Sequence, residues 1–158
     1  FTRAMAGGSD PCGAAPDAHV LHGGSARGRL VGGNLALVVS LMGTPYELSL
    51  DGAILVLEDV NEPVYRIDRM VTQLRLSGAL ERLAGIAFGR FTEIPDDGPD
   101  DGPEAGRSLD DVLREVADHA NVPCVANIPL GHIDDQWTVP LGATAQLNAD
   151  AKTLNVES

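Results

Sequence analysis

Apolar residues along the chain alternate between short continuous runs and helical spacing, with polar breaks between them. Ala53–Leu57 is a continuous run rich in branched side chains, which is typical of a strand buried on both faces. From Val64 to Leu74 the apolar residues fall on one helical face, which predicts a helix that ends at Gly78. These segments predict a buried strand followed by an amphipathic helix.

Two further helices are predicted from their capping residues. Asn34 is a good N-cap for the apolar stretch Leu35–Met42. Ser108, with Asp111 three residues later, resembles a capping box and predicts a helix that ends near Asn121. The other predicted strands are Leu30–Val31, Gly85–Phe91, Val122–Ile128, Trp137–Leu141, Thr144–Leu147 and Thr153–Val156. The order of elements predicts an α/β fold, with a mixed sheet of six or more strands and about three helices.

The first 27 residues differ from the rest of the chain. Residues 1–7 (FTRAMAG) suit the last turns of a helix, and residues 8–27 are rich in glycine and proline and lack periodicity. We therefore expect residues 1–27 to be the end of a preceding domain and an interdomain linker, and residues 28–158 to be one domain. Because the chain begins with Phe1, we expect it to be a piece of a longer protein.

Composition narrows the possible classes of function. The net charge is −12, and six of the 23 acidic residues lie in one loop, residues 93–104. This balance argues against nucleic acid as a partner, because phosphate binding needs basic patches. No apolar run approaches the roughly 20 residues that cross a bilayer, and two cysteines are too few for a disulfide scaffold. We expect a cytoplasmic protein with neither nucleic acid nor membrane as a partner.

Two carboxylates, Glu58 and Asp59, directly follow the buried strand predicted at residues 53–57. Ligands of α/β sheets gather at the carboxyl ends of strands, so a carboxylate here could orient a catalytic histidine. It could equally bind backbone amides, or pair with Arg66 or Arg69. The sequence leaves both interpretations open.

His132 follows another predicted strand, in the loop PLGHIDDQ. Histidine is the usual general base near neutral pH, although a single loop histidine is more commonly just solvated. None of the four histidines has zinc-ligand spacing with the cysteines. The turn at residues 32–34 lacks a full phosphate-loop pattern. We therefore expect no metal and no cofactor.

The candidate catalytic residues, Glu58 and His132, do not include a nucleophile. Ser9, in the stretch GGSDP, does not lie between a strand and a helix, which is the frame of a strained nucleophilic turn. A glutamate and a histidine without a nucleophile form an incomplete triad. The gap points to residues outside this chain.

Three stretches together resemble one known family. They are LVGGNLALVVSLMGTPY at residues 30–46, GAILVLEDVNEPVYRIDRMVTQLRLSGAL at residues 52–80, and IPLGHIDDQWTVPLGATAQLN at residues 128–148. In this order they resemble the C-terminal domain of L,D-carboxypeptidases, the serine peptidases of murein recycling. Relatives in that family include the microcin C immunity peptidases. The implied fold is a swivelling β/β/α-type domain.

The resemblance implies roles for particular residues. The family uses a Ser-Glu-His triad, whose glutamate lands on Glu58 and whose histidine lands on His132. The family's serine lies in its N-terminal domain, whereas the resemblance of this chain is to the C-terminal domain. Asn34, Asp59 and Arg66 are expected to support the pair or the substrate. Trp137 is expected to be a core residue.

The implied function is hydrolysis of the bond to the terminal D-Ala of a murein tetrapeptide. The chain would supply glutamate and histidine, contact its own N-terminal domain, and be inactive alone. The family is generally cytoplasmic and often forms homodimers. The alternatives are a peptidase of the microcin-immunity type, or a non-catalytic domain that binds murein peptides or dimerises.

Overall fold

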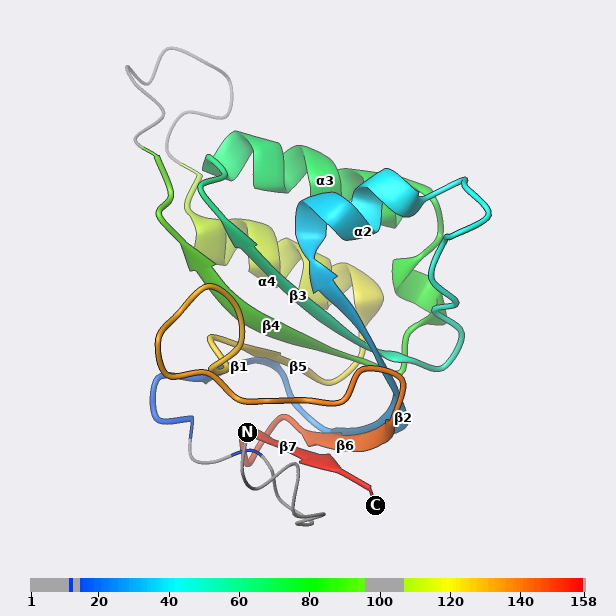
Figure 1. Ribbon diagram of the computed structural model, residues 1–158, viewed down its shortest axis with the longest axis vertical. Helices are drawn as coiled ribbons and strands as arrows, with labels where there is room; N and C mark the ends of the chain where they lie inside the picture. Colours follow the sequence, from blue (N-terminus) through cyan, green and yellow to red (C-terminus); the bar gives the residue numbers. More distant parts are fainter. Residues whose placement is uncertain (1–11, 13–14, 96–106, 158) are drawn as a thin grey trace.

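A computed structural model of the chain describes residues 12, 15–95 and 107–157. Within these ranges the strands form one seven-stranded sheet in the order β1-β5-β4-β3-β2-β6-β7 (Figure 1). The strands are β1 His19–His22, β2 Ser25–Asn34, β3 Ile54–Val60, β4 Gly85–Thr92, β5 Cys124–Ala126, β6 Thr144–Asn148 and β7 Thr153–Val156. The central strands β2 to β5 are parallel, and β1, β6 and β7 join the sheet antiparallel to their neighbours.

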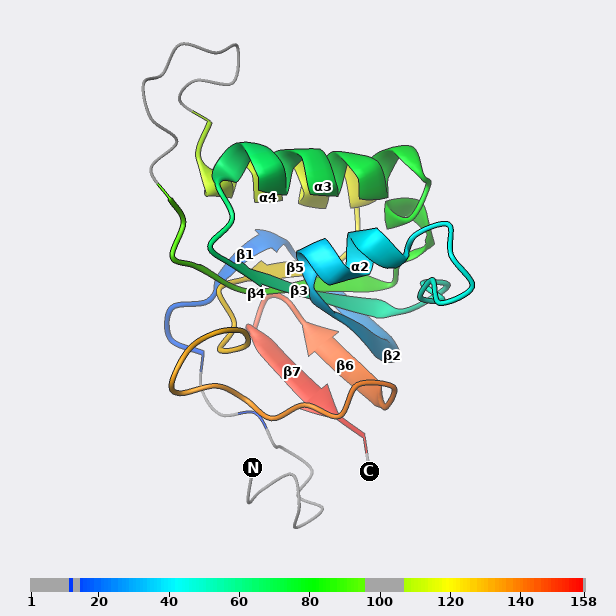
Figure 2. The same cartoon turned by 45° about the horizontal axis from the view of Figure 1, so that its top comes forward.

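In the described part of the chain, three helices cover one face of the parallel strands (Figure 2). They are α2 Leu35–Leu41, α3 Val64–Leu76 and α4 Leu109–Ala120, and a 3-10 turn spans Leu80–Arg82. Helix α2 begins where Asn34 accepts a hydrogen bond from the Leu37 amide at 3.1 Å. Helix α4 begins at a complete capping box made by Ser108 and Asp111.

Strand β2 connects the two parts of the sheet. Its residues 30–34 pair in parallel with β3, and its residues 25–29 pair antiparallel with β6. As a result β6 and β7 lie on the side of the sheet away from the helices (Figure 2). One apolar cluster packs between helices and sheet, and a second packs between the sheet and β6, β7 and residues 128–137.

The predicted fold class is confirmed: the domain is α/β, with a mixed sheet and about three helices. Strand β1 and the first residues of β2 lie within residues 1–27, in the stretch whose lack of periodicity suggested a linker. In the segment SARGR small residues alternate with polar ones, and the inward positions are Ala26 and Gly28. Such small side chains give almost no hydrophobic alternation, so the sequence hides this strand.

The strand predicted at Trp137–Leu141 is also wrong. This segment has no strand pairing; the Trp137 amide donates to the Pro129 carbonyl at 2.7 Å, and Pro140 has no amide hydrogen to offer a neighbour. The strand predicted at Val122–Ile128 forms only over Cys124–Ala126. Ser9, residues 1–7 and most of the acidic loop lie outside the described residues.

None of the helices in the described residues is both long enough and apolar enough to cross a bilayer.

Candidate active site

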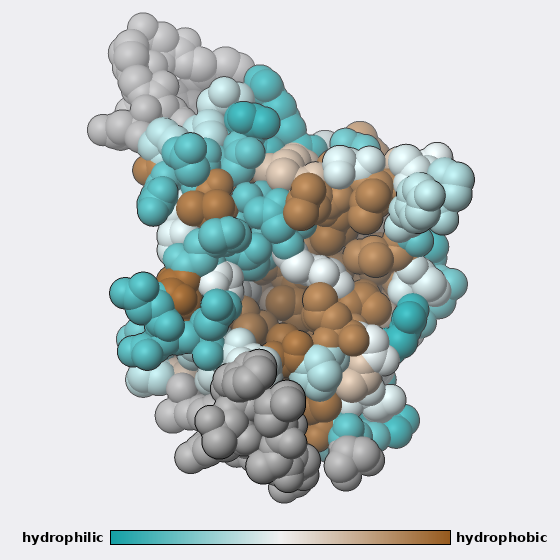
Figure 3. All heavy atoms as spheres, in the orientation of Figure 1, coloured by the Kyte–Doolittle hydropathy of each residue, from teal (hydrophilic) through white to brown (hydrophobic). Residues whose placement is uncertain are grey.

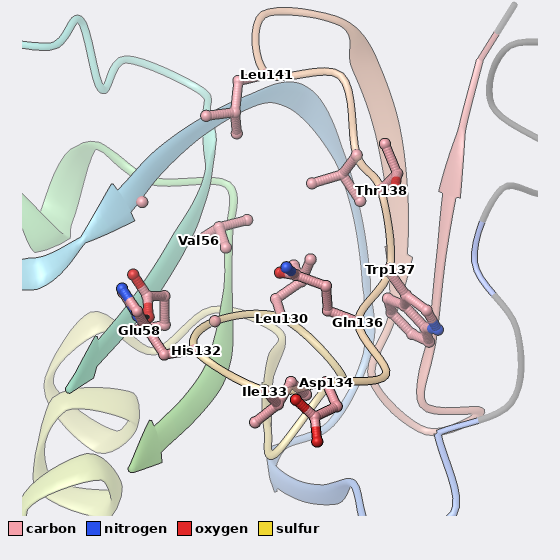
Figure 4. Close-up of a pocket in the computed structure, with 13 residues that line it drawn as sticks. Val56, Glu58, Leu130, His132, Ile133, Asp134, Gln136, Trp137, Thr138 and Leu141 are labelled. Atoms are coloured by element: carbon pink, nitrogen blue, oxygen red, sulfur yellow. Dashed lines mark hydrogen bonds and ion pairs between the residues drawn. The ribbon is translucent and has the colours of Figure 1, made fainter. Parts of the chain in front are cut away.

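An open groove of about 720 Å³ lies at the carboxyl ends of the parallel strands. Its walls come from the end of β3 and from the segment that follows β5, residues 130–141. Figure 4 shows Glu58 and His132 together on one side of this groove, with Trp137 and Thr138 on the other side. The groove therefore joins residues that are far apart in the sequence.

Glu58 and His132 form a hydrogen-bonded pair in this groove. The distance from His132 Nδ1 to Glu58 Oε2 is 2.8 Å. An ionised carboxylate only accepts hydrogen bonds, so Nδ1 carries the proton and donates. In the neutral ring Nε2 is then an acceptor, which is the state that a general base requires. The Glu58 side chain is 11% exposed and that of His132 is 55% exposed, so the carboxylate is enclosed and the ring is accessible.

The fold explains why these two residues meet. Glu58 lies at the end of β3, in register with Asn34 of β2. The segment after β5 is tied to β4, because the Ile128 amide donates to the Phe88 carbonyl at 3.1 Å and the Arg90 amide donates to the Leu130 carbonyl at 2.7 Å. Because of these bonds the chain passes the end of β3, and His132 lies beside Glu58.

Asp59 has a different role from its neighbour. It is 3% exposed and accepts hydrogen bonds from the Asn34 side-chain amide at 2.7 Å, the Ala36 amide at 3.0 Å and the Val60 amide at 2.9 Å. The carboxylate thus fixes the first turn of α2 to the end of β3. The two acids therefore have different partners: Glu58 binds a histidine, and Asp59 binds amides.

Arg66 is not brought to the groove. It lies on α3, its side chain is 55% exposed, and its Nε is 3.1 Å from the Glu62 carboxylate. Arg69 lies over the ring of Tyr65 instead of beside Glu58 or Asp59. The expectation that Arg66 supports the pair or the substrate therefore stays a prediction, and the contact that the structure shows for Arg66 is the one with Glu62.

Other groove residues were not singled out by the sequence. Gln136, Thr138 and Leu141 line the groove, and all three lie in the stretch that directly follows the GH motif. Trp137 is 9% exposed and belongs to the second apolar cluster, as predicted for a core residue, although it also borders the groove. The signal that could have found them was their position in the same loop as His132.

No serine or cysteine lines this groove within the described ranges. Burial raises the pKa of the Cys124 thiol well above its ordinary range, so this residue stays protonated and unreactive. The same part of the chain holds no group of three or more histidine, cysteine and acidic side chains arranged to bind a metal. The groove thus holds a hydrogen-bonded glutamate–histidine pair with neither serine nor cysteine among its described lining residues.

Comparison with known proteins identifies the family. The model of the LD-carboxypeptidase C-terminal domain matches residues 27–147. The chain belongs to this family. The chain spans about two fifths of the length of the curated relatives it matches.

Two members and one structural neighbour illustrate the similarity. A Bacillus subtilis protein named as a probable murein peptide carboxypeptidase is 38% identical over 85% of this chain and 41% of its own length. The muramoyltetrapeptide carboxypeptidase of Oxalobacter formigenes has a TM-score of 0.73 and 31% identity, over 84% of this chain and 45% of that one. The microcin C7 self-immunity protein MccF has a TM-score of 0.76 at 23% identity, over 90% of this chain and 41% of that one, which shows the fold alone.

Proposed function

We propose that this LD-carboxypeptidase chain contributes the glutamate and histidine of a Ser-Glu-His triad that removes the terminal D-Ala from murein tetrapeptides. The observation that carries the proposal is the 2.8 Å bond between His132 Nδ1 and Glu58, at the strand ends of a member of this family. The name of the Oxalobacter formigenes relative supports the choice of substrate.

His132 is the general base of the proposed reaction. Its Nε2 takes the hydroxyl proton of a serine as the serine oxygen bonds to the carbonyl carbon of the L,D peptide bond. The imidazolium then returns that proton to the leaving amine of D-Ala, which leaves an acyl-enzyme. Water, activated by the same Nε2, releases the tripeptide. Glu58 keeps the ring in the required tautomer and stabilises its charged form.

The serine is proposed to come from a part of the protein outside this chain. Two features support this: His132 faces an open groove, and apolar side chains gather on the same face of the molecule (Figure 3). Leu37 on α2 is 65% exposed and Leu141 on the groove wall is 55% exposed. Exposed apolar groups beside an incomplete site suit contact with another domain, here the N-terminal domain expected from the resemblance.

Asn34 and Asp59 are proposed as positioning residues. Their mutual bond of 2.7 Å links the ends of β2 and β3, and Glu58 is the neighbour of Asp59 in β3. Holding both strand ends fixes the point from which the Glu58 side chain starts. A cytoplasmic homodimer without nucleic acid or membrane as a partner is the further proposal that the resemblance supports.

The test is D-Ala release from purified murein tetrapeptide by the full-length protein and by its His132→Ala variant. We expect the variant to lose about 10³-fold or more in kcat, as loss of a triad base does, and the 158-residue chain alone to release none. The control is His119→Ala, because His119 also contacts a glutamate, Glu81 at 2.9 Å, but lies outside the groove. A near-normal rate in His132→Ala, or activity of the chain alone, would contradict the proposal.

A further inference from the structure

Two glycines closely enclose the Glu58 side chain. A methyl carbon at residue 131 would lie 2.9 Å from Glu58 Oε2 and 3.1 Å from Glu58 Cβ. A methyl carbon at Gly89 would lie 3.1 Å from Glu58 Cβ and 2.5 Å from the Leu130 carbonyl oxygen. Both positions are tighter than ordinary carbon–oxygen or carbon–carbon contact, so the Glu58 side chain fits only because residues 89 and 131 lack side chains.

The methyl position at residue 131 is crowded by the carboxylate oxygen of Glu58 that binds His132. Glu58 Oε2, 2.9 Å from that methyl position, is the same oxygen that accepts the hydrogen bond from His132 Nδ1. Gly131 itself has φ of +118°, a conformation that side-chain-bearing residues rarely adopt. A side chain at residue 131 would therefore compete for the space that Oε2 occupies.

The backbone around Gly131 has little freedom to retreat. The Arg90 carbonyl oxygen, a backbone atom, also lies only 3.0 Å from the methyl position. The turn is held by the bond from the Arg90 amide to the Leu130 carbonyl at 2.7 Å and by the Ile133 amide, which donates to the Gly131 carbonyl at 3.0 Å. The movable partner is thus the end of the Glu58 side chain.

We propose that Gly131 is a positioning residue for the proposed triad: its missing side chain leaves the space that holds Glu58 Oε2 against His132 Nδ1. Substitution displaces the carboxylate and removes the bond that selects the Nδ1-protonated ring. The catalytic meaning of this claim rests on the proposed function, whereas the geometric claim is testable without any activity.

The test is the tautomer of His132 in the chain, read from the ¹⁵N chemical shifts of its ring nitrogens in the neutral state. In Gly131→Ala we expect the ratio of Nδ1-protonated to Nε2-protonated ring to fall about tenfold, as loss of a hydrogen bond to a charged group predicts. Gly142→Ala is the matched control: φ there is +93°, but no atom lies within 4 Å of the added methyl. We expect this control to keep the wild-type ratio.

An unchanged ratio in folded Gly131→Ala overturns the proposal, and so does an equal change in Gly142→Ala. If Gly131→Ala does not fold, the double variant Glu58→Ala/Gly131→Ala decides, because the crowded carboxylate is then gone. Recovery of folding in the double variant supports the proposal. Failure of the double variant to fold, while Glu58→Ala alone folds, overturns it.

The outcomes separate this inference from the proposed function. If Gly131→Ala loses the tautomer but the full-length variant releases D-Ala normally, the triad role of Glu58 fails and the positioning of its carboxylate stands. If Gly131→Ala keeps the tautomer while His132→Ala abolishes activity, the positioning inference fails and the proposed function stands.

Discussion

Glu58 and Asp59 are adjacent buried carboxylates that serve opposite sides of the sheet. Glu58 is directed to the groove and accepts from an imidazole, whereas Asp59 is directed to the helices and accepts from one side-chain and two backbone amides. Their burial is similar, at 8% and 3% exposed. The difference lies in the partners: an imidazole exchanges protons near neutral pH, and amides do not. The same chemical group therefore has an imidazole partner at one position and amide partners at the next, which supports different proposed roles for the two residues.

The largest loss in kcat is expected when Glu58 is replaced in the full-length protein. Glu58→Gln should lower kcat by about 10³- to 10⁴-fold, because an amide no longer selects the Nδ1-protonated ring or stabilises the imidazolium. The free energy of unfolding should change by less than about 1 kcal/mol, since the amide keeps the shape of the carboxylate. Kinetics of D-Ala release and urea unfolding measure the two effects. A variant with wild-type kcat would remove Glu58 from the triad.

The matched change at the neighbouring position should have the reverse pattern. Asp59→Asn puts an amide group where three donors now point, so at least one donor loses its acceptor. We expect the free energy of unfolding to fall by about 2 kcal/mol, with faster amide hydrogen exchange in the first turn of α2. The loss in kcat should be much smaller than for Glu58→Gln. Equal losses in kcat with no loss of stability would show that the two carboxylates are not distinct.

A third carboxylate extends the comparison to the surface. Two hydrogen bonds lower the pKa of Asp111. The larger effect comes from the Ser108 hydroxyl and the smaller one from the Ser108 amide. Because folding lowers this pKa, the stabilisation is present above the ordinary carboxyl pKa and is lost as pH falls through the lowered value. Amide exchange in the first turn of α4 should therefore speed up in acid. Ser108→Ala should show a smaller acid effect, and an unchanged acid effect would contradict this cause.

Arg66→Ala should have the smallest effect. The Arg66 side chain is exposed, its pairing with Glu62 is an i, i+4 pair, and it does not line the groove. We expect the free energy of unfolding to change by less than about 0.5 kcal/mol and kcat to stay within about twofold, as for surface changes away from the site. A loss in kcat approaching that of Glu58→Gln would restore Arg66 to the groove and weaken the division between the two sides.

Sequence patterns located features that depend on local chemistry. Asn34 and Ser108 were recognisable as caps because a cap needs only neighbours three residues away. Glu58 was recognisable because a polar residue at the end of a buried strand is uncommon, and its partner came from the family resemblance. The pairing of β1 with β5 and the path of residues 137–141 depend on distant backbone contacts, which leave no periodic trace. Arg66 was expected to support the pair or the substrate, and that role stays a prediction; its contact with Glu62 depends on side-chain direction, which the sequence does not give.

The register of β3 against its neighbours has a consequence for motion. Glu58 is part of β3, and the segment before His132 is bonded to the adjacent strand β4 through residues 128–130. In the proposed full-length enzyme, a movement of this domain relative to another would therefore move these two groups together. Such a movement would change the distance between the His132 ring and the proposed serine. It would not change which ring nitrogen is protonated, because Glu58 moves together with His132.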